Sequence, residues 1–171
     1  MRSWIRLAWT GACVSLLTTR LFAASEISLS SRAFRAGEKI PEKFTCKGAN
    51  VNPALQFPGV PGNARSLLLV LEDPDAPTGL FTHWVIWNID PTTRQIAEAS
   101  SPAGAVRGTN DFGKTGYGGP CPPSGTHRYF FRLFALDQKL DLKSGAPRKD
   151  VDKAMAGHIL ARGELMGRST R

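Results

Sequence analysis

Residues 67–89 constrain the fold of this chain more than any other stretch, and they read LLLVLEDPDAPTGLFTHWVIWNI. The opening run, residues 67–71, is too short to span a membrane and is apolar at every position, which is typical of a strand buried on both faces. A second apolar run, residues 83–89, follows a polar turn. We therefore expect two buried strands, the first of them central in its sheet.

The turn between these strands carries two carboxylates, in the sequence Asp73-Pro74-Asp75-Ala76-Pro77. Proline lacks a backbone donor and disfavours helix in the residue before it, so both aspartates are predicted to lie on a stiff loop. Side chains alternate along a strand, which places His83 at the entrance of the second strand, on one face with Val85 and Trp87. A carboxylate and an imidazole are thereby predicted to share one rim of the sheet.

The least regular part of the chain, residues 97–126, is rich in glycine and proline, most densely at GGPCPPSG, residues 118–125. Glycines let backbone amides approach a ligand and prolines hold a loop in shape, so this segment is either an anion-binding wall or a solvated connector. A strand predicted at residues 127–136 follows directly, with His127 and Tyr129 on the same face at its entrance.

The first 24 residues are predicted to be a secretory signal peptide, because two arginines precede an apolar run that ends in small residues. A retained membrane anchor is the alternative. Cleavage leaves one domain, residues 25–171, without a membrane span, in the periplasm or outside the cell. The net charge of +8 is raised by arginines of this leader, and the other basic residues are scattered. We therefore expect no nucleic-acid partner.

Cys46 and Cys121 are the two cysteines that remain after removal of the leader, which contains Cys13. An exported protein matures where disulfides persist, so the two either form a bridge or stay as buried thiols.

A helix is predicted to begin near Pro147, because apolar residues recur at helical spacing through residues 151–159. It is expected to end at Gly163, with a short closing strand at residues 164–167. His158 lies on the apolar face of this predicted helix, so we interpret it as a packed structural residue and not as a ligand.

These motifs, in this order, resemble the phosphatidylethanolamine-binding protein family, in its bacterial Raf kinase inhibitor-like branch. The resemblance covers nearly all of the mature chain and rests on DPDAP at 73–77, HW at 83–84, GPCPP at 119–123, GTHRY at 125–129, FTCKG at 44–48, NPAL at 52–55 and AMAGH at 154–158. It implies a mainly β (β-rich α+β) fold, with a large central antiparallel sheet packed on a smaller sheet. Peripheral helices, including one near the C-terminus, complete the implied fold.

The resemblance also implies a small surface pocket for phosphate-like anions or phospholipid headgroups. By position, four polar residues line this pocket: Asp73, His83, His127 and Tyr129. Its walls are Ala76, Pro77, Gly119, Pro122 and Pro123. Because both cysteines flank pocket loops in this family, the resemblance favours the bridge between Cys46 and Cys121. The chain departs from the family pattern in its short loop after Pro77, in the lack of a further C-terminal helix, and in its last five residues, GRSTR.

The expected function is non-catalytic binding of a small anion, with no cofactor. One alternative is a protein inhibitor that acts on a partner protease or kinase. A second alternative is a metal-dependent phosphoester hydrolase with Asp73, Asp75, His83 and His127 as metal ligands. The sequence favours the binding protein, because the two aspartates would point apart on an extended loop and no paired-histidine ligand motif is present.

Overall fold

The computed structural model describes residues 25–171, so the predicted signal peptide lies outside the described residues. Within this range no helix has both the length and the apolar character needed to cross a membrane.

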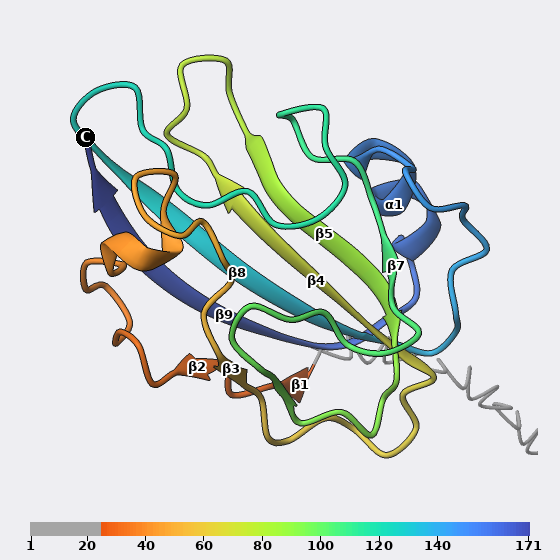
Figure 1. The fold of residues 1–171 in the computed structure, drawn as a ribbon. Helices are drawn as coiled ribbons and strands as arrows, with labels where there is room; N and C mark the ends of the chain where they lie inside the picture. The colour runs from red at the N-terminus through yellow and green to blue at the C-terminus, as the bar shows by residue number, and fades with distance from the viewer. Residues whose placement is uncertain (1–24) are drawn as a thin grey trace, which may run out of the picture.

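A six-stranded sheet with the strand order β1-β9-β8-β4-β5-β7 forms the body of the molecule (Figure 1). Its strands are β1 (Ser25–Glu26), β4 (Ser66–Asp73), β5 (Phe81–Ile89), β7 (Val106–Arg107), β8 (Thr126–Leu136) and β9 (Ile159–Thr170). Neighbouring strands are antiparallel except at one edge, where β1 runs parallel to β9. The predicted β-rich fold is confirmed, and the expected antiparallel sheet is mixed at this short edge.

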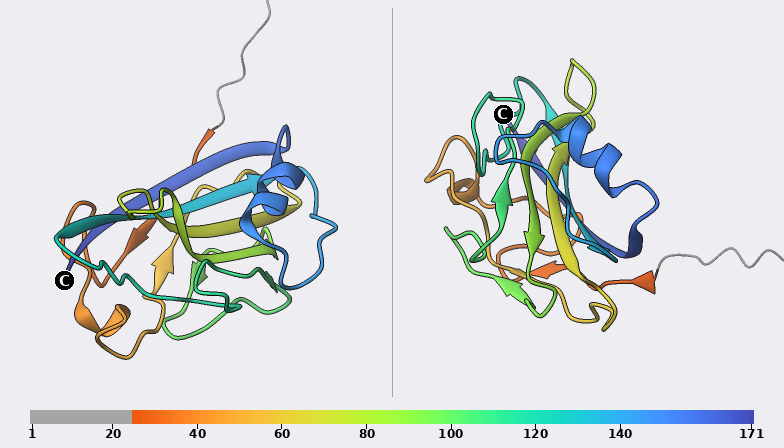
Figure 2. Two further views of the ribbon diagram at one scale, coloured as in Figure 1. Left: turned by 90° about the horizontal axis from the view of Figure 1, so that it is seen from above. Right: turned by 90° about the vertical axis from the view of Figure 1, so that its right-hand side faces the viewer.

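The second sheet is small, with the order β2-β3-β6. Its strands are β2 (Ser30–Ser31), β3 (Leu55–Gln56) and β6 (Gln95–Ile96). This sheet lies against one face of the large sheet, and helix α1 (Arg148–Met155) lies against the opposite face (Figure 2). The other helix of the described chain is a 3-10 turn, η1 (Glu42–Phe44), so the expected peripheral helices amount to these two elements.

Strand β4 is central, as predicted, and all eight of its residues are buried. Leu67, Leu69 and Leu71 point into the larger core, on the side of the small sheet. Leu68 and Val70 point into a second core beneath α1. Burial of a leucine side chain contributes roughly 2 kcal/mol, so this strand ties both layers together.

The C-terminal prediction was wrong in its boundaries. Helix α1 ends at Met155, and β9 occupies Ile159–Thr170, so neither His158 nor Ile159 belongs to the helix. Gly157 has φ of +82°, a conformation that ends a helix and that L side chains rarely adopt. From residue 161 onward every second residue is buried, as pairing along β8 requires.

The N-terminal segment covers the outer edge of β9 through backbone hydrogen bonds. The amide of Ile27 donates to the Arg162 carbonyl at 2.8 Å, and the amide of Arg168 donates to the Glu38 carbonyl at 2.8 Å. A β carbon at Gly163 would collide with the Ile27 carbonyl oxygen, so this close approach needs glycine. This segment then leads into η1 and the loop after it. Both lie at the end of the sheet that holds the candidate site.

Candidate functional site

Four polar side chains meet at the end of the large sheet where β4 ends and β8 begins. Asp73 is the last residue of β4, His83 lies near the start of β5, and His127 and Tyr129 lie near the start of β8. Their exposed fractions are 2%, 2%, 8% and 0%, respectively. The structure thus brings together the four residues predicted to line the pocket, and we call them the histidine cluster. The prediction for Asp73 differs in one detail, since it ends a strand and is not part of the loop.

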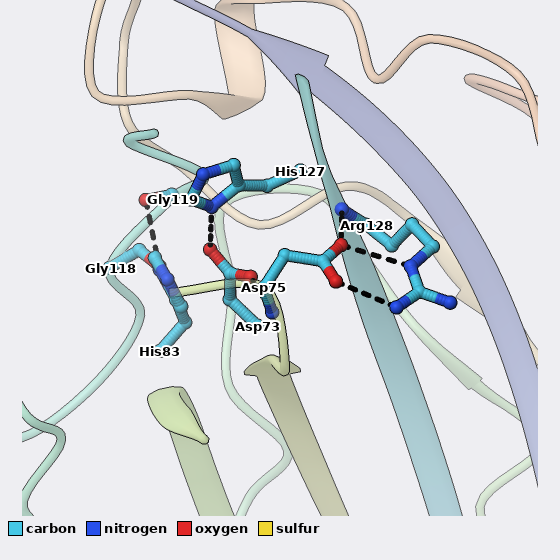
Figure 3. A network of polar contacts seen from close by, with 7 residues as sticks. All are labelled: Asp73, Asp75, His83, Gly118, Gly119, His127 and Arg128. Atoms are coloured by element: carbon cyan, nitrogen blue, oxygen red, sulfur yellow. Dashed lines mark hydrogen bonds and ion pairs between the residues drawn. The ribbon is translucent and has the colours of Figure 1, made fainter. Parts of the chain in front are cut away.

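Asp73 orients His127 (Figure 3). The Nδ1 atom of His127 lies 2.7 Å from Oδ2 of Asp73, and the backbone amide of Asp75 donates to Oδ1 at 2.8 Å. An ionised carboxylate only accepts hydrogen bonds, so Nδ1 carries the proton of this pair. The Nε2 atom of His127 therefore remains available to a ligand.

The loop that precedes β8 orients His83. Its Nδ1 atom lies 2.9 Å from the Gly118 carbonyl oxygen and 3.1 Å from that of Gly119, both of which accept (Figure 3). Nδ1 is thus the protonated nitrogen here as well. Burial lowers the pKa of His83 below its ordinary value, so its ring is neutral at pH 7 with an unprotonated Nε2.

Tyr129 lies between the two imidazoles. Its ring centroid is 5.2 Å from that of His83, edge to face, and 6.5 Å from that of His127, stacked. Its buried hydroxyl lies close to the Asp73 carboxylate and the Cys121 backbone, but within residues 25–171 it forms no hydrogen bond of normal geometry. Burial raises the pKa of Tyr129 well above its ordinary range, so the hydroxyl keeps its proton and can donate.

A β-bulge turns His83 towards Tyr129. Leu71 pairs with Trp84, whereas the next residue, Glu72, pairs with Thr82, so His83 is an extra residue in β5. Strict alternation predicted His83 on the face of Val85 and Trp87, in the core beneath α1. That prediction was wrong, because the bulge places His83 on the opposite face, with Tyr129.

The glycine-proline loop is anchored to the segment around η1. The Gly119 amide donates to Oδ1 of Asn50 at 2.7 Å, and a β carbon at Gly119 would collide with the Phe44 carbonyl oxygen. Cys46 and Cys121 form a disulfide with Cα atoms 5.4 Å apart, the bridge that the resemblance favoured. The loop is therefore a fixed wall beside His83, and not a solvated connector.

Three residues at the site were not predicted from sequence. Asn50 holds Gly119, Asn110 donates to the His83 carbonyl at 3.3 Å, and the ring of Phe112 packs edge-on to His83 with centroids 5.1 Å apart. Asn50 and Gly119 are 69 residues apart in the chain. A single sequence carries no signal for such a contact.

Asp75 is turned away from the cluster. It accepts hydrogen bonds from the backbone amide, Nε and Nη2 of Arg128 at 2.9, 2.9 and 2.6 Å (Figure 3). These bonds lower the pKa of Asp75 to about 2. The metal ligands required by the hydrolase alternative are thus not assembled, and within residues 25–171 no three His, Cys, Asp or Glu side chains are grouped to hold a metal ion.

The predicted wall residues lie in two places. Ala76 and Pro77 are in the turn after β4, where Ala76 is half-buried and Pro77 is exposed. Gly119 touches His83 through its carbonyl. Pro122 and Pro123 line a groove of about 450 Å³ on the neighbouring surface, whose lining does not include the histidine cluster.

The fold and the sequence place this chain among known proteins. A family model described as "Phosphatidylethanolamine-binding protein" matches residues 30–170. The chain belongs to the phosphatidylethanolamine-binding protein family. The family resemblance stated from the motifs is confirmed.

Several relatives of this family are similar over most of their length. A UPF0098 protein of Methanothermobacter thermautotrophicus is 50% identical over 146 residues, which cover 82% of this chain and 97% of the relative. The crystal structure of a phosphatidylethanolamine-binding protein homologue of Chlamydia trachomatis has a TM-score of 0.82 at 40% identity and covers 86% of this chain and 99% of its own. Escherichia coli YbcL, described as a member of the mammalian family, has a TM-score of 0.81 at 30% identity with the same coverage.

Proposed function

We propose that this protein binds a small phosphate-like anion at the histidine cluster, and that it acts as a binding protein and not as an enzyme. One observation carries the proposal. Each imidazole uses Nδ1 for a protein contact and leaves Nε2 free, and both rings pack against the buried Tyr129, whose hydroxyl forms no hydrogen bond of normal geometry in the described chain. Together these atoms can offer an oxyanion three donors when both rings are protonated.

The proton state of the imidazoles sets the sign of the pH dependence. A neutral ring with its proton on Nδ1 presents a lone pair at Nε2, which repels an anion. Because burial lowers the pKa of His83, this ring must take up a proton to donate to the ligand. Affinity is therefore expected to rise as the pH falls through about 6.5 and below.

The burial of the cluster restricts the ligand. His127, at 8% exposed, is the most accessible of the four residues, so we place the entrance on its side. A single phosphate or phosphodiester group matches the three donors. The name of the family model adds phospholipid headgroups to the candidates.

We further propose that the protein works outside the cytoplasm, in the periplasm or as a secreted protein. The leader-like sequence of residues 1–24 and the Cys46–Cys121 disulfide support this location. The disulfide also occupies Cys121, so this cysteine is not available as a nucleophile.

Titration calorimetry with glycerophosphoethanolamine tests the anion site, because this phosphodiester keeps a single negative charge between pH 5.5 and 7.5. We expect tighter binding at pH 5.5, and about ten- to hundred-fold weaker binding by the His127→Ala variant, which loses a charge-assisted hydrogen bond.

His158→Ala is the matched control, because Nδ1 of His158 contacts Oδ1 of Asp137 at 2.8 Å, as that of His127 contacts Asp73. This variant should bind like the wild type. Equal, pH-independent binding by all three proteins would contradict the assignment of the site.

A further inference from the structure

A groove lies directly beside the histidine cluster. It has a volume of about 450 Å³, and its lining includes Cys46, Lys47, Cys121, Pro122, Ser169 and Arg171. Three segments far apart in sequence meet there: the loop after η1, the loop that leads into β8, and the C-terminal end of β9 (Figure 1). The disulfide joins the first two of these segments, so these two parts of the lining are held together covalently.

Strand pairing connects the groove to the cluster. Ser169 on β9 is the register partner of His127 on β8, and Ser169 lines the groove. Pro122 also lines the groove, and it lies three residues after Gly119, whose carbonyl oxygen contacts His83. The entrance proposed beside His127 and the groove are therefore adjacent along the β8–β9 pair.

The groove contains two cationic side chains. Lys47 and Arg171 lie in its lining, and within residues 25–171 neither side chain forms an ion pair with an Asp or Glu side chain. The main-chain carboxylate of Arg171 offsets one of these two charges. Nη1 of Arg171 donates to the Pro123 carbonyl at 2.7 Å, which fixes the guanidinium against the loop. No acidic residue is part of the lining. The surface between the cations is formed by proline rings and the disulfide.

We propose that this groove is a second subsite, which receives a carboxylate or further phosphate group of a ligand whose first phosphate is held by the histidine cluster. The ligand class is thus a phosphate ester with a second anionic group on a short, largely apolar spacer. This inference rests on the proposed anion site, which supplies the first contact. Lys47 and Arg171 select the ligand through charge, and the proline faces accept the spacer.

Paired probes separate the two sites. One series consists of alkyl phosphates that end in a carboxylate, with two to five methylene groups, and the matched series ends in a hydroxyl. At low salt, the best carboxylate probe should bind the wild type about three- to tenfold more tightly than its hydroxyl partner, as two exposed charge contacts allow. This preference should shrink at 200 mM salt.

The double variant Lys47→Met/Arg171→Gln should lose the preference and bind the hydroxyl probes as the wild type does. Lys149→Met on helix α1 is the matched control and should retain the preference. Equal binding of both series by the wild type would overturn the subsite and leave the histidine site intact. A preference that survives in the double variant would also overturn it. If neither series binds, the proposed function itself fails.

Discussion

At the scale of single residues, the hydroxyl of Tyr129 is the feature that a purely structural network does not explain. A buried polar group without a partner is unfavourable by about 1–3 kcal/mol. His83 and His127 use Nδ1 for other contacts, and neither they nor the nearby Asp73 carboxylate and Cys121 backbone form a hydrogen bond of normal geometry with this hydroxyl. A ligand oxygen between these residues would supply the missing partner.

Tyr129→Phe removes this hydroxyl and keeps the ring that packs between the imidazoles. We expect unchanged or slightly higher stability, since an unsatisfied group is deleted, together with roughly two- to tenfold weaker binding of glycerophosphoethanolamine. Urea unfolding and calorimetry on the same samples measure the two effects. A variant that loses more than about 1 kcal/mol of stability would show that the hydroxyl has a structural partner.

The sequence located all four cluster residues by a simple rule: each lies near the end of a strongly apolar strand. The orientation of His83 could not be found in this way. It depends on how β5 pairs with β4, and the extra residue in β5 leaves the hydrophobic pattern unchanged. Only the paired strands show that His83 faces Tyr129.

At the scale of elements, the loop of residues 118–123 acts as a rigid wall because it is fixed at several points. The carbonyls of Gly118 and Gly119 hold His83, Asn50 holds the Gly119 amide, and the disulfide holds Cys121. Loss of any of these anchors should loosen the imidazole and not only the loop.

Replacing both cysteines, Cys46→Ser/Cys121→Ser, tests this coupling. The disulfide closes a loop of 75 residues, so its removal should lower the free energy of unfolding by roughly 2–5 kcal/mol. Affinity for glycerophosphoethanolamine should fall as well, because the wall beside His83 becomes mobile. Urea unfolding and calorimetry, with reduced wild type as the matched sample, check both. An unchanged affinity would show that the loop is held without the disulfide.

The C-terminal region shows where periodicity misleads. Val151 and Met155 are helical and buried, and the same spacing continues across the turn to residues that belong to β9. The inward-facing positions of β9 include Gly163 and Gly167, which have no apolar side chain and so weaken the period-two signal. His158 consequently lies in a partly exposed pair with Asp137 and not in a core. The predicted packing role of His158 was wrong for this reason.

At the scale of the whole molecule, the central strand β4 binds two cores together and ends at the candidate site. The apolar runs at 67–71 and 127–136 predicted two of the long buried strands, whereas the two-sheet fold was implied by the family resemblance. The site loops could not be predicted, because their positions depend on contacts between distant segments.

Acid stability depends on Asp75, which joins the turn after β4 to the start of β8. Hydrogen bonds from Arg128 lower its pKa to about 2, against 3.8 for the free side chain. Its contribution is therefore present above pH 4 and is lost as the pH falls towards 2. Asp75→Asn should be less stable than the wild type at pH 7 and should lose less stability between pH 4 and 2. Urea unfolding midpoints of the two proteins, measured between pH 7 and pH 2, test this prediction. If the midpoints of both proteins change with pH by the same amount, the prediction is wrong.

The central claim is that both free imidazole nitrogens donate to one anion, and histidine ¹⁵N NMR tests it most directly. The chain has three histidines, and His158 serves as an internal reference outside the cluster. With glycerophosphoethanolamine bound at pH 7, Nε2 of His83 and Nε2 of His127 should both be protonated and hydrogen-bonded, and the signals of His158 should be unchanged. If all three histidines keep their spectra while the ligand binds, the anion lies elsewhere and the account is contradicted.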